Sequence, residues 1–130
     1  MKDYVEGFEK HSARIISCKI KLKDEYRQII QVYAPTTSYD DNDTDILYDD
    51  LENAIYQKKC KQFIIMGDLN AKIGIKENNE DNEWIGPHGI GERNESGERL
   101  LDFVSANRMY ITTHFFSKTP HTILDMAFTW

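Results

Sequence analysis

The sequence lacks several features that define whole classes of protein. Its 130 residues include two cysteines, Cys18 and Cys60, which match neither a zinc motif nor a disulfide framework. We expect both to be reduced, buried thiols. No apolar stretch follows Met1 to make a signal peptide, and no run is long enough to cross a membrane. The sequence therefore predicts an intracellular protein without a disulfide scaffold.

An excess of positive charge is also missing. The chain has 16 basic and 22 acidic residues, which gives a formal net charge of -6. Proteins that grip a phosphate backbone usually carry a basic face, because binding releases counterions. The balance argues against tight nucleic-acid binding by the chain alone, and it leaves room for a local basic patch or a metal-bridged contact. With 40% hydrophobic and 29% charged residues, the composition is that of an ordinary globular domain with a modest core.

Alternation predicts a β-hairpin in the first third of the chain. Residues 14–22 alternate between apolar and polar side chains, which predicts a strand with the apolar set buried. The polar set includes a row of lysines, which we interpret as a solvated face rather than a nucleic-acid contact. Residues 26–33 predict a second strand, which ends before Ala34-Pro35 because proline cannot donate to a ladder. The apolar set is Ile16, Cys18, Ile20 and Leu22, and the lysines are Lys19, Lys21 and Lys23.

The rest of the chain alternates between helix and strand patterns. Helical spacing of apolar residues, acidic helix starts and a short continuous apolar run supply the signals. A long glycine-containing loop lies between the predicted buried strand and the second predicted helix, and loops of such length are usually functional. The order predicts an α/β layered sandwich. The predicted elements are a helix over residues 43–59, a buried strand over 62–66, a loop over 71–93, a helix over 95–107 capped by Asn94, and a strand over 108–116.

The string Gly67-Asp68-Leu69-Asn70 directly follows the predicted buried strand. Where a strand leaves a sheet, a carboxylate and an amide two residues apart can face one crevice. Asp68 would there hold Mg²⁺ or orient a water, and Asn70 would donate to a phosphate oxygen. An ordinary Asp/Asn turn after a strand explains the same residues equally well.

Tyr33 closes the second predicted strand, just before Ala34-Pro35. Its hydroxyl would reach the same end of the sheet as Asp68 and hydrogen-bond a phosphate there. A half-buried strand tyrosine is the simpler interpretation of this residue taken alone.

Together these strings resemble a known family. A strand ending in Val-Tyr-Ala-Pro-Thr precedes an acidic amphipathic helix and then Phe-Ile-Ile-Met-Gly-Asp-Leu-Asn-Ala-Lys-Ile-Gly, which resembles the endonuclease/exonuclease/phosphatase superfamily. The string Gly-Ile-Gly-Glu-Arg-Asn-Glu-Ser-Gly-Glu-Arg-Leu-Leu-Asp-Phe begins at Gly89. It is similar to the endonuclease domain of LINE-type retrotransposons of the RTE/BovB group, and to host proteins derived from such elements. The resemblance covers residues 15–116, in the family's order.

The resemblance implies a four-layer α/β sandwich with mixed sheets and flanking helices, Mg²⁺ or Mn²⁺ as cofactor, and a nuclear location. It implies DNA as the partner and hydrolysis of a phosphodiester bond as the reaction. Residue by residue, it implies that Tyr33 contacts phosphate, that Asp68 positions the attacking water and helps to hold the metal, and that Asn70 binds the scissile phosphate. Asn94 matches a recurrent position of the retrotransposon group, and helix capping explains it without further chemistry.

The chain also departs from the family pattern. Complete members begin earlier, with an asparagine and the glutamate that ligates the metal, and they continue to an Asp-His pair whose histidine is essential. We therefore expect residues 1–130 to be a single truncated domain without that glutamate and that histidine. His121 and Asp125 offer a substitute histidine-carboxylate pair, but their order and surroundings do not match the family.

These observations leave three hypotheses. The first is a nuclease fragment with little or no activity alone, since losing one member of a catalytic set costs orders of magnitude. The second is a working Mg²⁺ nuclease with a reduced site built on Tyr33, Asp68 and Asn70. The third is a non-enzymatic interaction module, whose exposed sheet edges and apolar faces would bind a partner chain. A phosphatase of small phosphoesters ranks last, because the Gly-Glu-Arg-Asn string favours the retrotransposon branch.

Overall fold

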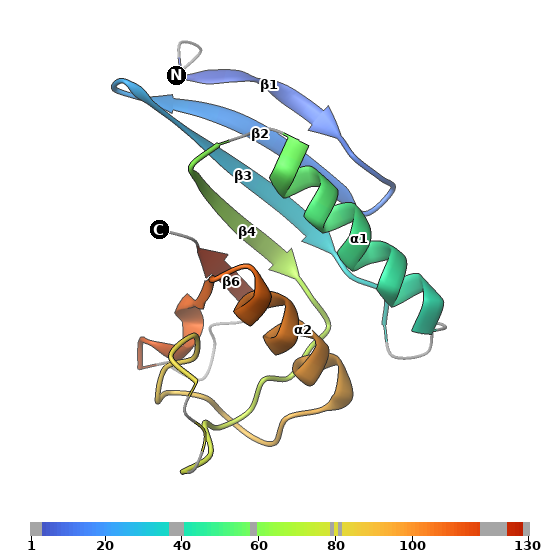
Figure 1. Cartoon of the computed structure of the whole chain (residues 1–130), viewed down its shortest axis with the longest axis vertical. Coiled ribbons are helices and arrows are strands. Elements are labelled where there is room, and N and C mark those ends of the chain that lie inside the picture. The colour runs from blue at the N-terminus through green and yellow to red at the C-terminus, as the bar shows by residue number, and fades with distance from the viewer. Residues whose placement is uncertain are drawn as a thin grey trace.

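The computed structural model describes residues 4–36, 41–57, 60–78, 80, 82–117 and, for the backbone, 125–128. Its described strands form a mixed sheet in the order β1-β2-β3-β4-β6-β5, and both described helices lie on one face of that sheet (Figure 1). The predicted α/β class is therefore confirmed, with a helix layer and a sheet layer in view. The elements are β1 (Val5–Lys10), β2 (Ile15–Leu22), β3 (Glu25–Tyr33), α1 (Asp41–Gln57), β4 (Gln62–Asp68), α2 (Glu95–Ala106), β5 (Tyr110–Ile111), the 3-10 helix η1 (Thr112–His114) and β6 (Asp125–Phe128).

The predicted hairpin is present as β2 and β3. The two strands pair antiparallel with Leu22 opposite Glu25, and Lys23 takes a positive φ of 56° in the turn between them. β3 ends at Tyr33, directly before Ala34-Pro35, as proline's missing N–H requires. The antiparallel partner β1 was not predicted, because its exposed strand lacks apolar alternation.

The predicted orientation of β2 is wrong. Ile15 and Ser17 are buried, at 2% and 4% exposure, whereas Ile16 and Leu22 are each 43% exposed. Side chains alternate between the two faces of a strand, so a one-residue error in phase exchanges the faces. The helix layer packs on the Ile15 side, which leaves the predicted apolar set on the opposite, accessible face.

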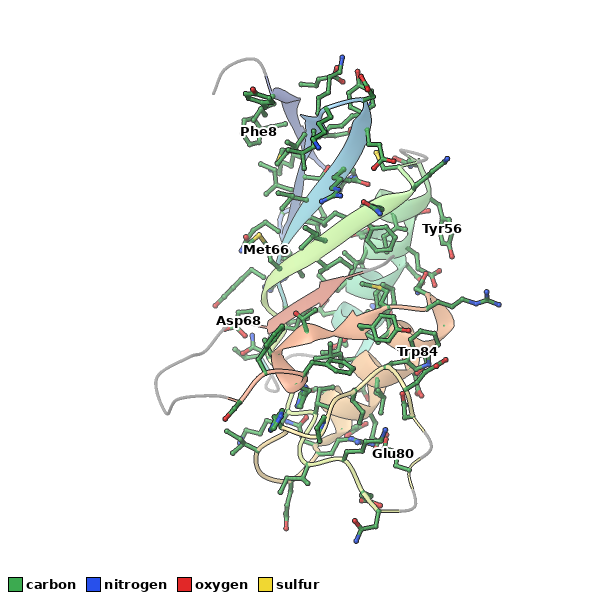
Figure 2. The ribbon with its side chains drawn as sticks, turned by 90° about the vertical axis from the view of Figure 1, so that its left-hand side faces the viewer. Phe8, Tyr56, Met66, Asp68, Glu80 and Trp84 are labelled. Atoms are coloured by element: carbon green, nitrogen blue, oxygen red, sulfur yellow. The ribbon has the colours of Figure 1, made fainter. Side chains whose placement is uncertain are left out.

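β4, like β2, fully buries only the side chains that face the helices. Its apolar run was predicted to be buried on both faces, but only Phe63 and Ile65, which face the helices, are fully buried. Ile64 and Met66 lie on the other face and are half-buried. Figure 2 shows Met66 on the same side of the sheet as Phe8, away from the helices.

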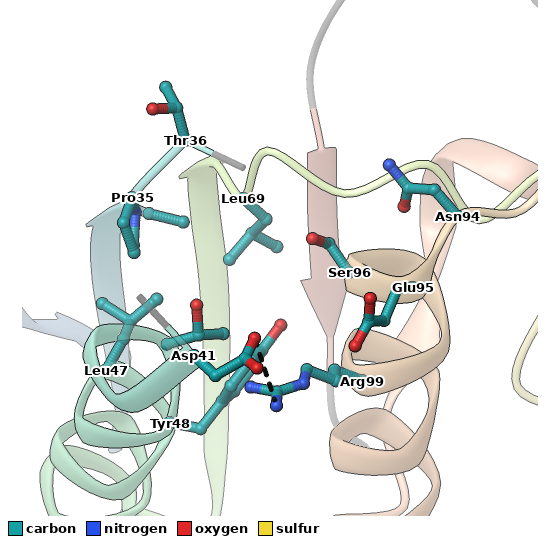
Figure 3. Close-up of a pocket in the computed structure, with 12 residues that line it drawn as sticks. Pro35, Thr36, Asp41, Leu47, Tyr48, Leu69, Asn94, Glu95, Ser96 and Arg99 are labelled. Carbon is teal, nitrogen blue, oxygen red and sulfur yellow. Dashed lines mark ion pairs between the residues drawn. The ribbon is translucent and has the colours of Figure 1, made fainter. Parts of the chain in front are cut away.

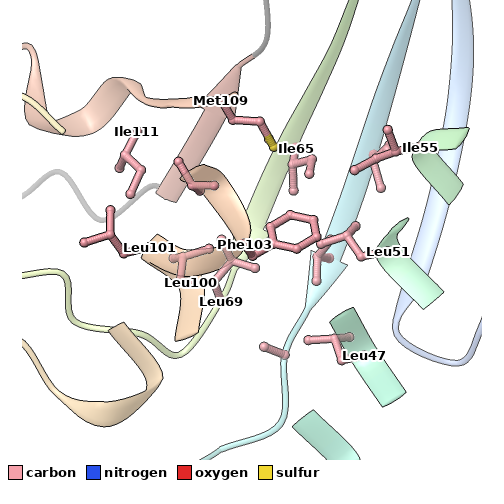
Figure 4. Close-up of a cluster of buried hydrophobic side chains, with 14 of the residues drawn as sticks. Leu47, Leu51, Ile55, Ile65, Leu69, Leu100, Leu101, Phe103, Met109 and Ile111 are labelled. Carbon is pink, nitrogen blue, oxygen red and sulfur yellow. The ribbon is translucent and has the colours of Figure 1, made fainter. Parts of the chain in front are cut away.

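α1 connects β3 to β4, which run parallel. Apolar residues at helical spacing form its buried stripe, and the acids Asp41 and Asp43 in its first turn suit the helix dipole. The described helix starts two residues before the predicted one. Its stripe joins the buried faces of the sheet and of α2 in one core (Figure 4). The α1 contribution to this core is Leu47, Leu51, Ala54 and Ile55.

α2 follows a long loop, as predicted. Asn94 caps the helix, since its side chain accepts a hydrogen bond from the backbone N–H of Gly97. Arg93 holds the loop by a bidentate pair with Glu80, at 2.9 and 2.8 Å, and by a 2.7 Å bond from Nε to the carbonyl of Ile73. The strand predicted over residues 108–116 is mostly wrong, because only two residues pair before the chain enters η1.

Other sequence predictions have mixed outcomes. Cys18 and Cys60 are free, as expected, but both are half-buried rather than buried. Desolvation raises the pKa of the Cys18 thiol. No helix in the described part of the chain has the length and apolarity needed to cross a membrane. The alternative histidine-carboxylate pair falls mostly outside the described residues, which include neither His121 nor the side chain of Asp125.

Candidate functional site

Tyr33 and Asp68 end neighbouring parallel strands, and they are direct partners in the register of β3 and β4. Side chains at paired positions of parallel strands point to the same face, and such strands lie about 4.8 Å apart. The backbone N–H of Ala34 donates to the carbonyl of Asp68 at 2.8 Å, which extends the pairing beyond the strand ends. The fold therefore brings the predicted tyrosine and aspartate together at the C-terminal ends of β3 and β4.

Asn70 completes the turn that begins at Asp68. Its backbone takes a φ of 46°, in the left-handed region that asparagine tolerates better than most residues. Its N–H donates to Oδ1 of Asp68 at 2.9 Å, and its Nδ2 donates to the carbonyl of Ala34 at 2.8 Å. The Asn70 side chain thus ties the end of β4 to the end of β3, and the Asn70 backbone N–H fixes the orientation of the Asp68 carboxylate.

The turn is open to solvent and lies near positive charge. Tyr33 is 58% exposed, and Asp68 is also exposed. The guanidinium of Arg14 lies 5.9 Å from the centre of the Tyr33 ring, and its Nη1 is 3.4 Å from the Tyr33 carbonyl. Lys72 is exposed two residues after Asn70. An anion that approaches Tyr33 therefore meets the guanidinium of Arg14, although the chain is acidic overall.

Sequence reasoning missed Arg14 altogether. The residue precedes β2, and its place beside Tyr33 depends on a backbone bond of 3.0 Å from the Tyr33 N–H to the Arg14 carbonyl. That bond follows from the pairing of β2 with β3. No short motif in the sequence signals it.

The donor set at the turn suits a hard divalent cation. Mg²⁺ is usually held in proteins by one or two carboxylates together with waters and substrate phosphates, rather than by an all-protein cage. Asp68 supplies an exposed carboxylate whose direction is fixed by Asn70. Within the described ranges, no cluster of three or more His, Cys, Asp or Glu side chains forms a preassembled metal site. The turn thus offers one exposed carboxylate, which could hold such a cation only together with waters and a substrate phosphate.

A cavity of about 150 Å³ lies behind the turn, between the starts of α1 and α2 (Figure 3). Arg99 on its wall pairs with Asp45 at 2.9 Å and with Asp41 at 3.8 Å. Burial raises the pKa of Tyr48, which also lines the cavity, to about 12, against a smaller lowering by Arg99. The acids neutralise the single guanidinium of this wall, so the cavity does not suit a phosphate group.

The backbone of Asp125 pairs with Gly67 across β6 and β4. The start of β6 therefore lies beside the C-terminal end of β4, where Asp68 is. This placement concerns the backbone of Asp125 alone.

The described part of the chain is thus an α/β domain with a mixed sheet, helices on one face, and two parallel strands that end in an exposed tyrosine and aspartate. The family model described as "Endonuclease-reverse transcriptase" matches residues 27–129. The chain therefore belongs to this family, as the resemblance to endonuclease/exonuclease/phosphatase domains led us to expect.

Two curated proteins that share one name are similar to this chain. Craniofacial development protein 2 from Bos taurus is 30% identical over 131 residues, which cover 100% of this chain and 21% of that protein. Craniofacial development protein 2 from Tragulus javanicus is also 30% identical over 131 residues, which cover 22% of its length. The chain thus spans about a fifth of the curated relatives that it matches.

Proposed function

We propose that the chain is part of a metal-dependent DNA endonuclease descended from a LINE-type retrotransposon of the RTE/BovB group. The observation that carries the proposal is the register pairing of Tyr33 with Asp68, joined by Asn70 in the same turn. Phosphodiester hydrolysis needs an oriented water and neutralisation of charge on the phosphoryl oxygens. Asp68 could orient the water, and the Asn70 amide and the Tyr33 phenol could donate to phosphoryl oxygens, whereas neutralisation of the charge would need a cation.

Each residue has a role in this proposal. Asp68 orients the attacking water, because the Asn70 N–H fixes its Oδ1 and so directs the carboxylate toward solvent. Asn70 donates to the scissile phosphate from its amide, and Tyr33 donates its hydroxyl to a phosphate oxygen. Arg14 adds positive charge beside Tyr33.

Mg²⁺ or Mn²⁺ would be held by Asp68 and would supply neutralisation of phosphoryl charge. The turn from Asp68 to Asn70 provides one carboxylate, that of Asp68. We therefore propose that this chain is weak or inactive by itself, because a catalytic set that lacks a cooperating member loses orders of magnitude in rate. DNA is the proposed partner, and the nucleus is the proposed location.

A plasmid-nicking assay tests this function. The purified, folded chain would be incubated with supercoiled plasmid and Mg²⁺, beside Asp68→Asn and an EDTA control. Asp68→Asn keeps an oxygen acceptor for the Asn70 N–H, so the turn is preserved while the charge is lost. We expect at most slow nicking that needs both Mg²⁺ and Asp68. Nicking that persists in the variant or in EDTA would contradict the assignment.

A non-enzymatic interaction module is the second candidate, and the accessible sheet face favours it. Phe8 is 74% exposed there, Ile16 and Leu22 are each 43% exposed, and β1 presents an edge of the sheet. Contiguous apolar surface and open strand edges are features of interfaces with partner chains. A monodisperse monomer in light scattering at working concentration would count against self-association through this face.

A further inference from the structure

We propose that Asn94 is a positioning residue, which holds the Asp68–Asn70 turn in place from the start of α2. The inference rests on the proposed function of that turn. It goes beyond the helix-capping role that explains Asn94 in the sequence.

Asn94 contacts both backbone groups of Lys72. Its Oδ1 accepts from the N–H of Lys72 at 3.1 Å, and its own N–H donates to the Lys72 carbonyl at 3.0 Å. The same Oδ1 accepts from Gly97 at 2.8 Å, which is the capping bond. Capping alone needs only the bond to Gly97, so the two bonds to Lys72 require a separate explanation.

Gly97 allows this close approach. A Cβ atom at Gly97 would clash with the carbonyl oxygen of Lys72. The first turn of α2 therefore packs directly on the backbone that follows the candidate site. A side chain larger than hydrogen at this position would push Lys72 away from Asn94.

These contacts fix the turn at both ends. On one side, Asn70 Nδ2 binds the carbonyl of Ala34 at the end of β3. On the other side, Asn94 holds Lys72, two residues beyond Asn70. The left-handed backbone of Asn70 costs less for asparagine than for most residues, and contacts at both ends of the turn help to hold it. Loss of Asn94 would release the second end and let the Asp68 carboxylate reorient.

Three variants and a matched control separate positioning from capping. Asn94→Ala removes the shared acceptor, whereas Asn94→Asp keeps an oxygen at the same place. Asn94→Ser retains good capping on a shorter side chain, and it replaces Asn94→Ala if that variant does not fold. The control is Asn107→Ala, which removes a 2.9 Å side-chain bond to the Phe103 carbonyl at the other end of α2.

The measurement is amide hydrogen exchange by NMR, without metal or DNA. Loss of a hydrogen bond should speed exchange about fivefold or more at the released amides. We expect Asn94→Ala to do so at Lys72 and also at Asn70, whose N–H binds Asp68 Oδ1. Asn94→Asp should restore protection at both amides, and Asn107→Ala should leave both unchanged. Unchanged exchange at Asn70 in Asn94→Ala, or in Asn94→Ser if that replaces it, would overturn the proposal and leave capping as the role of Asn94.

A second readout keeps this inference distinct from the proposed function. Mn²⁺ would be titrated into the wild type and Asn94→Ala while line broadening at the Asp68 amide is followed. We expect weaker Mn²⁺ binding in Asn94→Ala, with rescue in Asn94→Asp. If the wild type shows no Mn²⁺ binding at Asp68, the metal-dependent function fails, and the exchange data still decide whether Asn94 positions the turn.

Discussion

Tyr33 and Asp68 sit side by side because their strands pair in parallel register, not because of any bond between their side chains. The backbone ladder brings the two residues together, and Asn70 then fixes the carboxylate. Substitutions of the exposed side chains should therefore change chemistry and leave the fold intact.

Tyr33→Phe tests this separation. The ring is 58% exposed, so removal of the hydroxyl should change the free energy of unfolding by less than about 0.5 kcal/mol in urea titrations. Affinity for a duplex oligonucleotide in Mg²⁺, measured by fluorescence anisotropy, should fall. Unchanged affinity would remove Tyr33 from the phosphate-binding role, and a large loss of stability would show that the hydroxyl is structural.

Asn70→Ala and Asn70→Gly separate backbone conformation from side-chain bonding. Both variants lose the bond to the Ala34 carbonyl. Only alanine also pays for the positive φ, which costs an L residue about 1 to 2 kcal/mol relative to glycine's freedom. We expect Asn70→Gly to be the more stable of the two by about 1 kcal/mol in chemical denaturation. Equal stabilities would mean that the turn relaxes out of the left-handed region.

The Arg93–Glu80 pair should make stability depend on acid pH. Hydrogen bonds from Arg93 lower the pKa of Glu80 below its ordinary value of 4.5. A carboxylate with a lowered folded pKa stabilises the protein above its unfolded pKa, and that contribution disappears as the pH falls through the folded value. Wild type should therefore exceed Glu80→Gln in unfolding free energy at pH 7, and the difference should shrink at pH 3.

The control for this pair is Glu83→Gln, an exposed residue of the same loop. It should follow the wild type at both pH values. A difference between wild type and Glu80→Gln that stays constant with pH would show that Glu80 acts through its shape rather than its charge.

The accessible sheet face gives a prediction about association. Phe8→Ser should lower the average mass in light scattering at high concentration if this face binds another chain, because it removes apolar area from the face. Ile90→Ser is the matched control, since Ile90 is 69% exposed in the loop before α2. Equal effects of the two changes would indicate general solubility rather than a specific surface.

Local patterns in the sequence predicted much of what positions the site. The β3 end at Tyr33 follows from Ala34-Pro35, and the Asn94 cap follows from an asparagine before a helical apolar pattern. The proximity of Tyr33 and Asp68 follows because Tyr33 closes one predicted strand and Asp68 lies just after the end of another. Strand ends and helix caps depend on residues close together in the sequence, so short segments are enough to predict them.

The features that the sequence did not predict depend on contacts between segments far apart in the chain. The buried face of β2 could not be read from alternation alone, because Ile15 and Ile16 are both apolar and α1, far along the chain, decides which of them is covered. The role of Arg14 beside Tyr33 needed the pairing of β2 with β3. The bonds from Asn94 to Lys72 needed α2 to pack on the end of β4. Each of these is tertiary information.

The most direct test of the account is to locate a bound divalent cation on the folded chain by Mn²⁺ line broadening in NMR spectra. We expect the amides of Tyr33, Asp68 and Asn70 to broaden first, and Asp68→Asn to abolish this broadening. Broadening centred instead on the acidic start of α1, at Asp41 and Asp43, and unchanged by Asp68→Asn, would contradict a metal-dependent site at the end of β4.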